Sequence, residues 1–561
     1  MRRYVRHLRT TPQSMPIPDV PHMVPNRAGG FVYPLSDEER LWRFLVLGSA
    51  DGSYYASAPE LTRENAFVVD RLLEAGKGPW VVDRIVEVSE SGRAPRQEPA
   101  ILALALCLRT APDVETRRRA AEATPRVCRT VTALASLAEA SKAVGAKPGW
   151  GRVARRAFNN WLTSRTPADL AYQAVKYRQR QGWTLADVMR RSRPLLDAED
   201  ERRPIIDWVL DRQAHARPRS PRHGRTTANL PAIVEAFERI QAETDPTQAA
   251  RLVRDHRLPW EAVPDRFARD LAVQEALFEN MPTTAMLRQL GRLTNLGLIT
   301  PGGEHAHEVV RRLEDRERLR RARVHPFALF LAHATYAAGH GLRGHLSWKP
   351  VPEVMEALEA AFFASFGNLR PSGRRLLTAI DFSGSMGSPF LLDVPNLSPA
   401  LAGTVMAAIT LRTEPGAVAL AFDTRVTEFH LDRETSIAGL TEAAERTLHH
   451  LGGGTDCAAP IVHAIQHWSD LDGIVLYTDE ETWAGSVHPI EAISQYRARW
   501  ERPTKMVTVA MVAHGYTLAN RNREGRPEDA GAMTAVGMDP NVPALIGEFL
   551  AREPAAAGWP P

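Results

Sequence analysis

Polar side chains follow two apolar runs in the C-terminal third of the chain. The run "LLTAI" ends at Asp381, and Ser383 and Ser385 follow at alternate positions. Further along, Thr455 follows three glycines in "LGGGTDC", and Asp479 ends the run "GIVLYTD". Hard divalent cations prefer carboxylate and hydroxyl oxygens as ligands, and two carboxylates at one point repel each other without a cation. The five residues therefore predict one divalent-cation site, for which Mg²⁺ is the expected ion.

This interpretation depends on the fold. Apolar runs with β-branched residues are typical of buried strands, and here they alternate with amphipathic segments. The expected strands are 375–381, 417–423, 473–479 and 505–513, and the expected helices are 398–413, 436–451, 459–468 and 488–500. The alternation predicts a doubly wound α/β domain over 370–561, in which ligands bind beyond the carboxyl ends of the strands. A D-x-S-x-S pattern alone is more typical of a helix N-cap or a turn, so Thr455 and Asp479 carry the metal interpretation.

The same region contains no familiar catalytic motif. Ser385 does not stand in G-x-S-x-G, because the residue two positions before it is another serine, Ser383. The histidines of "HGLRGH" (340–345) do not form H-E-x-x-H, and there is no Walker loop. We therefore expect a protein that is not an enzyme.

The part of the chain before this domain has a different periodicity. Between about 37 and 366 apolar residues recur at helical spacing, and helix caps and breakers separate the segments at short intervals. Such a series of amphipathic helices predicts an α-solenoid over 31–369. Residues 1–30 are basic and rich in proline, without the apolar region of a secretory signal, and are expected to be a disordered tail. With three scattered cysteines and no apolar run long enough to span a membrane, the protein is expected to be cytoplasmic.

Charge is distributed unevenly along the chain. The segment 371–561 has a net charge of −9, and the segment 1–370 has one of +13. A basic helical part suggests a polyanionic partner, although ordinary solubility charge explains this number equally well.

The strongest basic stretch is 149–194. Lys176 and Arg180 are four residues apart on one expected helix, and Arg190 and Arg193 share a face of the next one. Clustered guanidinium groups suit phosphates, whereas a single basic run is more often a solvated helix face.

Motifs along nearly the whole chain resemble a known family. The helical part resembles the TROVE module of the Ro ribonucleoproteins, which bind Y RNAs, in "LWRFLVLGSADGSYY" (41–55), "GWGRVARRA", "AVKYRQRQGW" and "MPTTAMLRQLGRL" (281–293). The C-terminal part resembles the von Willebrand factor A domain of the same family in "AIDFSGSM", "GGTDC" and "YTDEETWAGSVHPIEA". Its five polar residues match the metal-ion-dependent adhesion site of such domains, where a partner's carboxylate completes the coordination of the cation.

The resemblance implies a fold and a function. HEAT-like helical repeats would close into a ring, with the A domain joining its ends. Y-like RNA would bind the outer surface through Lys176, Arg180 and Arg193, where the family has a histidine at the position of Arg193. Arg190 is expected on the same surface because it shares the second basic helix face with Arg193. Single-stranded 3′ ends of misfolded noncoding RNA would enter the central hole.

Arg288 and Arg292 are the candidates for the hole, because their four-residue spacing places them on one helix face; pairing with acidic residues in the core is an equally good explanation. The expected protein is a monomer that acts in RNA quality control with an exoribonuclease. The alternative is a protein-binding scaffold that works through Mg²⁺ in the A domain, with RNA binding incidental.

Overall fold

The chain folds into two compact units. The structure is a computed structural model that describes residues 10–551 apart from positions 19, 21, 48–65, 92–93, 95–96, 146–148, 178–181, 195, 198, 216–228, 323, 325, 342–345, 366–370, 388–389, 392–393, 396, 513, 520–530 and 537–540. One unit is Val69–Phe362, and the other combines Met1–Val68 with Phe363–Pro561. The compact units therefore do not follow the boundaries 1–30, 31–369 and 370–561 expected from the sequence, because the N-terminal residues group with the α/β domain.

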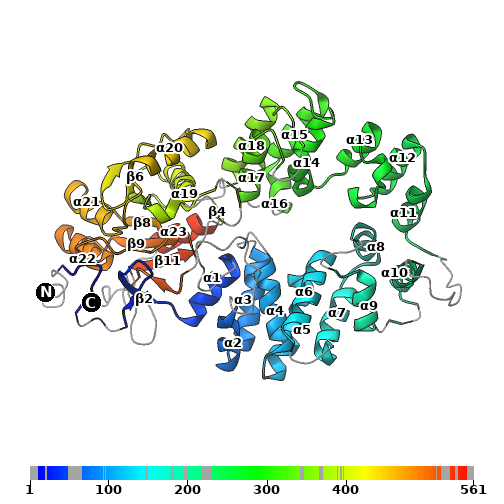
Figure 1. The fold of residues 1–561 in the computed structure, drawn as a ribbon, viewed down its shortest axis with the longest axis horizontal. Coiled ribbons are helices and arrows are strands. Elements are labelled where there is room, and N and C mark those ends of the chain that lie inside the picture. Colours follow the sequence, from blue (N-terminus) through cyan, green and yellow to red (C-terminus); the bar gives the residue numbers. More distant parts are fainter. Residues whose placement is uncertain are drawn as a thin grey trace. The chain divides into compact units, whose positions relative to one another are not determined.

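The unit 69–362 is built from helices, as the periodicity predicts (Figure 1). Its helices are α2 (Phe67–Glu74), α3 (Gly78–Ser91), α4 (Glu98–Arg109), α5 (Val114–Val127), α6 (Val131–Ala143), α7 (Gly151–Thr163), α8 (Pro167–Lys176), α9 (Leu185–Ser192), α10 (Arg203–His215), α11 (Ala232–Ala242), α12 (Pro246–His256), α13 (Leu271–Glu279), α14 (Thr283–Asn295), α15 (Glu304–Glu314), α16 (Arg316–Arg321), α17 (Pro326–Ala337) and α18 (Pro352–Ala364), with short 3₁₀ turns at Trp260–Ala262 (η2) and Asp265–Phe267 (η3).

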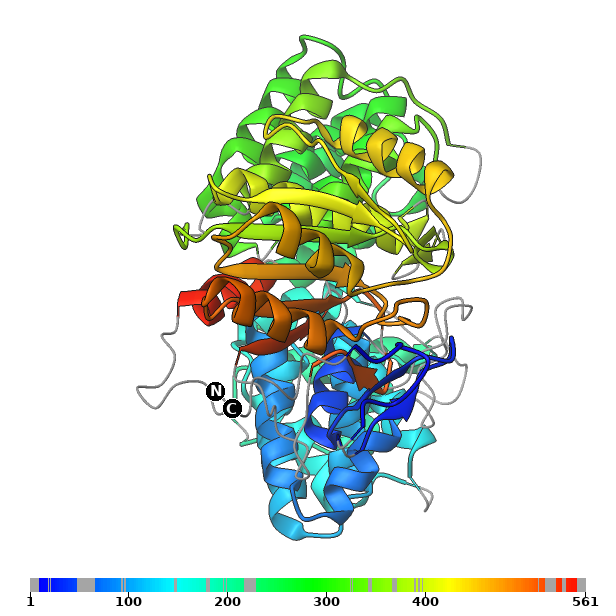
Figure 2. The same cartoon turned by 90° about the vertical axis from the view of Figure 1, so that its left-hand side faces the viewer.

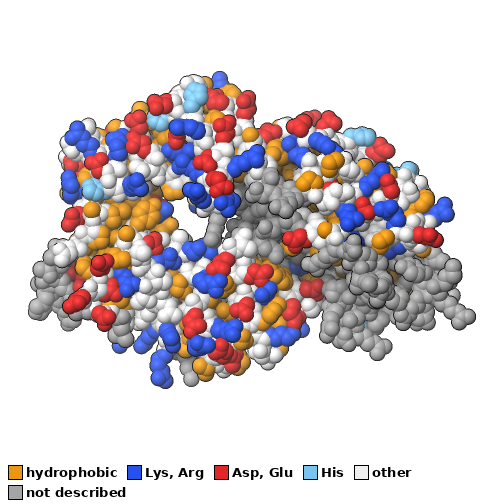
Figure 3. All heavy atoms as spheres, turned by 180° about the vertical axis from the view of Figure 1, so that it is seen from behind, with side chains coloured by type: hydrophobic (Ala, Val, Ile, Leu, Met, Phe, Trp, Pro, Cys, Tyr) orange, Lys and Arg blue, Asp and Glu red, His pale blue; other side chains and the backbone are white. Residues whose placement is uncertain are grey.

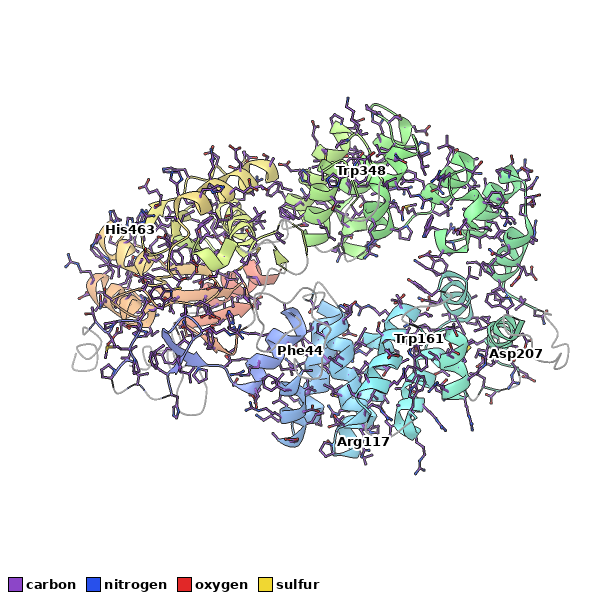
Figure 4. All side chains as sticks on the ribbon, viewed as in Figure 1. Phe44, Arg117, Trp161, Asp207, Trp348 and His463 are labelled. Carbon is purple, nitrogen blue, oxygen red and sulfur yellow. The ribbon has the colours of Figure 1, made fainter. Side chains whose placement is uncertain are left out.

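Side-chain caps and close helix packing fix these elements. Asp113, Thr130 and Thr184 accept hydrogen bonds from the first-turn amides of α5, α6 and α9 and so satisfy donors that a helix start leaves unpaired. Helices two apart in the chain pack together, as in α3 with α5, α4 with α6 and α5 with α7. Trp161 of α7 is fully buried (Figure 4) and donates its indole N–H to the carbonyl of Cys128. The repeated pairing supports the predicted α-solenoid.

The second unit contains a six-stranded sheet. Its strands are β3 (Leu376–Asp381), β6 (Val418–Phe422), β7 (Val426–Glu428), β8 (Gly473–Thr478), β9 (Lys505–Ala510) and β11 (Ala532–Val536), and its helices are α1 (Asp37–Leu47), α19 (Pro399–Thr413), α20 (Ile437–His450), α21 (Ala459–His467), α22 (Pro489–Trp500) and α23 (Asn541–Ala551). The strand order is β11-β9-β8-β3-β6-β7, and all neighbours are parallel except β6 with β7 (Figure 2). This is the predicted doubly wound domain, with β7 and β11 as edge strands that the sequence did not indicate.

Helices cover both faces of this sheet. On one face α19 packs on β3 and β8, and a Cβ atom at Gly403 would lie 3.0 Å from Ile380. On the other face α21 and α22 pack together and share a core with the strands, which includes Leu377, Leu476 and Ile493. Both faces are buried, so the strands are apolar throughout, as parallel sheets require.

The N-terminal residues belong to this core. Ile17, Val32 and Tyr33 are buried in the same cluster as the sheet. β1 (Val24–Pro25) and β2 (Phe31–Pro34) pair with β10 (Tyr516–Thr517) in a three-stranded antiparallel sheet. The expectation of a disordered tail over 1–30 is therefore wrong for the described residues from position 10 onward. Proline and basic residues suggested disorder, but long-range pairing orders the segment.

No helix among the described residues is both long and apolar enough to cross a membrane.

Candidate metal centre and basic surfaces

Four of the five predicted metal ligands meet in one hydrogen-bond chain. Asp381 ends β3, and its Oδ1 accepts a hydrogen bond of 2.8 Å from the backbone N–H of Ser383. The hydroxyls of Ser383 and Ser385 lie 3.3 Å apart, and Ser385 donates to Oδ2 of Asp479 at 2.5 Å. Asp479 directly follows β8, the strand beside β3. The parallel neighbours thus bring residues that are distant in the chain to one edge of the sheet.

Thr455 reaches the same edge through its loop. The amide of Gly384 donates to the carbonyl of Gly453 at 3.2 Å, which joins the serine turn to the glycine loop. The amides of Trp483 and Ala484 donate to the carbonyl of Thr455 at 3.0 and 3.1 Å, which joins this loop to the segment after Asp479. Thr455 is only 3% exposed.

Burial perturbs the two carboxyl groups. Desolvation raises the pKa of Asp381 to about 6, partly opposed by hydrogen bonds from Thr478 and Ser383. Desolvation also raises the pKa of Asp479 to about 7, and the negative charges of Glu481 and Glu480 add to the shift. Two buried carboxyl groups joined by hydroxyls offer hard oxygens at a place where their own negative charge is disfavoured. The residues present therefore fit a divalent cation, and its charge would offset that cost.

The neighbouring acidic residues are directed to other partners. Glu480 forms a buried ion pair with Arg43 of α1 at 2.7 Å. Glu481 accepts a hydrogen bond from the hydroxyl of Tyr516 and lies 3.3 Å from Nε2 of His514. In the described part of the chain no three His, Cys, Asp or Glu residues group as a metal site, so the candidate site depends on its hydroxyl ligands.

The predicted outer RNA surface lies on α8 and α9. Lys176, the last residue of α8, lies over the rings of Tyr172 and Tyr177 at 5.5 and 5.4 Å. Arg193 is exposed at the end of α9. Arg190 donates to the carbonyl of Leu210 and lies 3.8 Å from Asp187, and Arg180 falls outside the described residues. Lys176 and Arg193 have no acidic partner among the residues described and remain open to an anion.

Three arginines on α7 extend this surface. Arg152, Arg155 and Arg156 are exposed, share one helix face, and make no ion pair within the described chain. One turn further along α7, Asn159 donates to the carbonyl of Ser192, the residue before Arg193. Their three- and four-residue spacing in "GWGRVARRA" was the signal that could have revealed them.

Arg288 and Arg292 of α14 differ in environment. Arg288 is exposed, whereas Arg292 is half-buried, donates to the carbonyl of Ala268 at 2.5 Å and lies 4.3 Å from the ring of Trp260. Burial, together with the charge of Arg269, lowers the pKa of Arg292. Neither Arg288 nor Arg292 pairs with a carboxylate among the described residues. The alternative that these arginines pair with acidic residues in the core of the repeats is therefore not supported.

A cavity of about 640 Å³ adjoins this group of arginines. Its lining residues are Ala268, Arg269, Arg292, Asn295, Leu296 and Leu346. Trp260 and Leu346 are among the few large hydrophobic side chains exposed on the described surface. On the surface view, basic and acidic side chains are otherwise interspersed (Figure 3).

Together these features define a class: a helical-repeat protein joined to a von Willebrand factor A-type domain. The family model for the TROVE domain matches residues 24–337, and that for the Ro60 vWA domain matches residues 375–550. The chain belongs to the Ro family of TROVE-domain proteins.

Relatives match it over almost their whole length. It is 37% identical over 532 residues to the RNA-binding protein RO60 of Deinococcus radiodurans, which covers 94% of this chain and 96% of that one. It is 32% identical over 590 residues to the RNA-binding protein RO60 of Caenorhabditis elegans, with 94% and 90% covered. The crystal structure of the Deinococcus radiodurans RO (RSR) protein matches with a TM-score of 0.68 at 34% identity, covering 92% of this chain and 99% of that one.

Proposed function

We propose that this chain is a non-catalytic RNA-binding protein of RNA quality control. The observation that carries the proposal is the set of cations without acidic partners on α7 to α9, in a chain whose relatives are named as RNA-binding proteins. Phosphate contacts supply most of the affinity of such surfaces, and guanidinium groups grip phosphate with two hydrogen bonds.

Structured, Y-like RNA binds this α7–α9 surface in our proposal. Lys176 and Arg193 supply two of its contacts, Arg180 and Arg190 further ones, and the arginines of α7 widen the surface. A duplex suits an outer helical face, because double-stranded RNA is recognised by its shape and backbone.

Single-stranded 3′ ends of misfolded noncoding RNA bind at a second place, near Arg288 and Arg292. The cavity is lined by Arg269 and Arg292, and Arg292 lies over the ring of Trp260, so positive charge and an aromatic ring stand together here. Unstacked bases and their phosphates bind to such combinations without sequence preference. The closure of the helical repeats into a ring, with this place facing its hole, is part of the same proposal.

The A domain holds a divalent cation, with Mg²⁺ as the expected ion, through Asp381, Ser383, Ser385, Thr455 and Asp479. When bound, the cation would offer its positive charge to a carboxylate of a partner protein. An exoribonuclease is the proposed partner. The two buried carboxyl groups also favour the alternative, in which this protein contact is the main function and RNA binding is incidental.

One experiment separates these proposals. A hairpin RNA is titrated with and without a single-stranded 3′ extension, against wild type, Lys176→Ala/Arg193→Ala and Arg288→Ala/Arg292→Ala, in the presence and absence of EDTA. We expect the first variant to weaken both RNAs and the second to remove only the gain from the extension. If both variants bind both RNAs as tightly as wild type, the RNA proposal is contradicted and the protein-binding scaffold remains as the function.

A further inference from the structure

The side chain of Gln13 is held between the two loops that carry Thr455 and Asp479. Gln13 is 0% exposed. Its Nε2 donates to Oδ1 of Asp456 at 2.7 Å and to the carbonyl of Val487 at 2.8 Å, and its Oε1 accepts from the hydroxyl of Thr482. One amide group near the start of the chain thus uses both ends to join two loops of the C-terminal domain.

The fit around this side chain is close. The backbone N–H of Gln13 donates to the carbonyl of Gly485 at 2.9 Å. A Cβ atom at Gly485 would lie 2.3 Å from both Gln13 Nε2 and Asp456 Oδ1, so only glycine lets these groups meet. Asn26, also in the N-terminal segment, donates its side-chain amide to the carbonyl of Thr482 at 2.7 Å.

The groups that Gln13 contacts adjoin the metal ligands. Asp456 follows Thr455 directly, and Thr482 lies shortly after Asp479. Thr482 also accepts from the amide of Cys457 at 3.0 Å, and the amide of Trp483 donates to the carbonyl of Thr455. The position of Thr455 relative to Asp479 is therefore fixed by a network that has Gln13 at its centre.

We propose that Gln13 is a positioning residue for the metal centre: it sets the separation of the glycine loop and the loop after β8, and thereby the cation affinity. This inference rests on the proposed metal site. Partners that orient the ligands of a metal typically change its affinity by about 10- to 100-fold when removed. The N-terminal segment is thus a functional part of the A domain, although it comes from the opposite end of the chain.

Thr11 offers a matched control. It is almost as buried as Gln13, and its amide and hydroxyl both donate to Glu491 at 3.0 Å. Glu491 lies in the first turn of α22 and also accepts a hydrogen bond from the amide of His488, so this contact is at the far end of the segment after β8 and involves neither Asp456 nor Thr482. Thr11→Ala therefore removes a buried hydrogen bond from the same segment and leaves the contacts of Gln13 with Asp456 and Thr482 in place.

The test is calorimetric titration of MgCl₂, and of MnCl₂ as a second probe, into full-length wild type, Gln13→Ala, Gln13→Met and Thr11→Ala. The cation-induced rise in unfolding temperature is measured in parallel. We expect about tenfold weaker cation binding and a smaller rise for both Gln13 variants, and wild-type values for Thr11→Ala. Gln13→Met keeps the volume of the side chain, so it serves if Gln13→Ala does not fold.

The outcomes that would overturn the proposal are distinguishable. A wild type that binds neither cation overturns the metal site and this inference together. Equal affinity of wild type and the Gln13 variants overturns the inference alone. Equal weakening by Thr11→Ala and the Gln13 variants also overturns it, because the segment would then act only through overall stability.

Discussion

At the scale of single residues, protons would compete with the proposed cation for Asp381 and Asp479. Burial raises the pKa of both carboxyl groups, to about 6 and about 7. A carboxyl group in an unfolded chain ionises near pH 4, so between that value and pH 7 the metal-free folded state binds more protons than the unfolded one. Without a cation, stability therefore decreases as the pH rises through this window. The proposed cation would bind the ionised form and so reverse that loss.

The first prediction concerns the ligand itself. Asp381→Ala removes a carboxylate from the centre of the hydrogen-bond chain, so calorimetry on the full-length protein should detect no Mg²⁺ binding. Asp470→Ala is the control, since Asp470 pairs with Arg375 on the surface, away from the site. Equal binding by Asp381→Ala and wild type would exclude this residue as a ligand.

The second prediction is a pH dependence with a defined sign. Because Mg²⁺ must displace protons from Asp381 and Asp479, its affinity should be at least about tenfold higher at pH 7.5 than at pH 5.5. The rise in unfolding temperature on adding Mg²⁺ should increase over the same interval. An affinity independent of pH would show that carboxyl groups with raised pKa values do not bind the ion.

At the scale of elements, the N-terminal segment is where local sequence and structure disagree. The strands β3, β6, β8 and β9 and helices α19 to α22 begin and end close to the predicted bounds, because buried parallel strands and amphipathic helices carry their own periodicity. The segment 10–34 has no such periodicity. Its order comes from partners near the other end of the chain, such as Glu491 and Thr482, and from pairing of β2 with β10.

The third prediction tests this packing. A Cβ atom at Gly30 would lie 1.8 Å from the carbonyl oxygen of Thr482, a backbone atom that cannot move independently. Gly30→Ala should therefore lower the free energy of unfolding of the A-domain unit by about 1–3 kcal/mol, measured by urea denaturation. Gly547→Ala is the control: a Cβ atom there meets nothing within 4 Å, and alanine favours a helix such as α23. Similar stability of the two variants would contradict the close contact.

Positions in the candidate metal centre could be predicted from the sequence only where they follow elements that could themselves be predicted. That the five proposed metal ligands lie at one edge of the sheet could be expected, because each follows a strand or a glycine loop and parallel neighbours place such residues together. Gln13 could not be identified in this way, since no spacing relates it to Thr482. The arginines of α7 could have been found from their helical spacing, whereas the contact of Arg292 with Trp260 depends on how η2 packs on α14.

At the scale of the whole molecule, charge separates along the chain. The segment 1–370 has a net charge of +13, and the segment 371–561 has one of −9. Much of the positive charge is already neutralised: Arg118, Arg254 and Arg320, for example, form ion pairs with glutamates. The exposed arginines of α7 make no such pair within the described chain, and they are the ones available to phosphate. The central claim is that this unpaired charge, and not the total charge, binds RNA.

The most direct test is the salt dependence of the affinity for one hairpin RNA. It is measured for wild type, for Arg152→Ala/Arg155→Ala/Arg156→Ala, and for Arg118→Ala/Arg254→Ala/Arg320→Ala, which removes the same charge from paired positions. Each lost phosphate contact should flatten the slope of log K against log salt by about one unit, so we predict a clearly shallower slope and weaker binding for the α7 variant and a wild-type slope for the paired-arginine variant. Equal slopes for all three proteins, or equal losses in both variants, would contradict the claim.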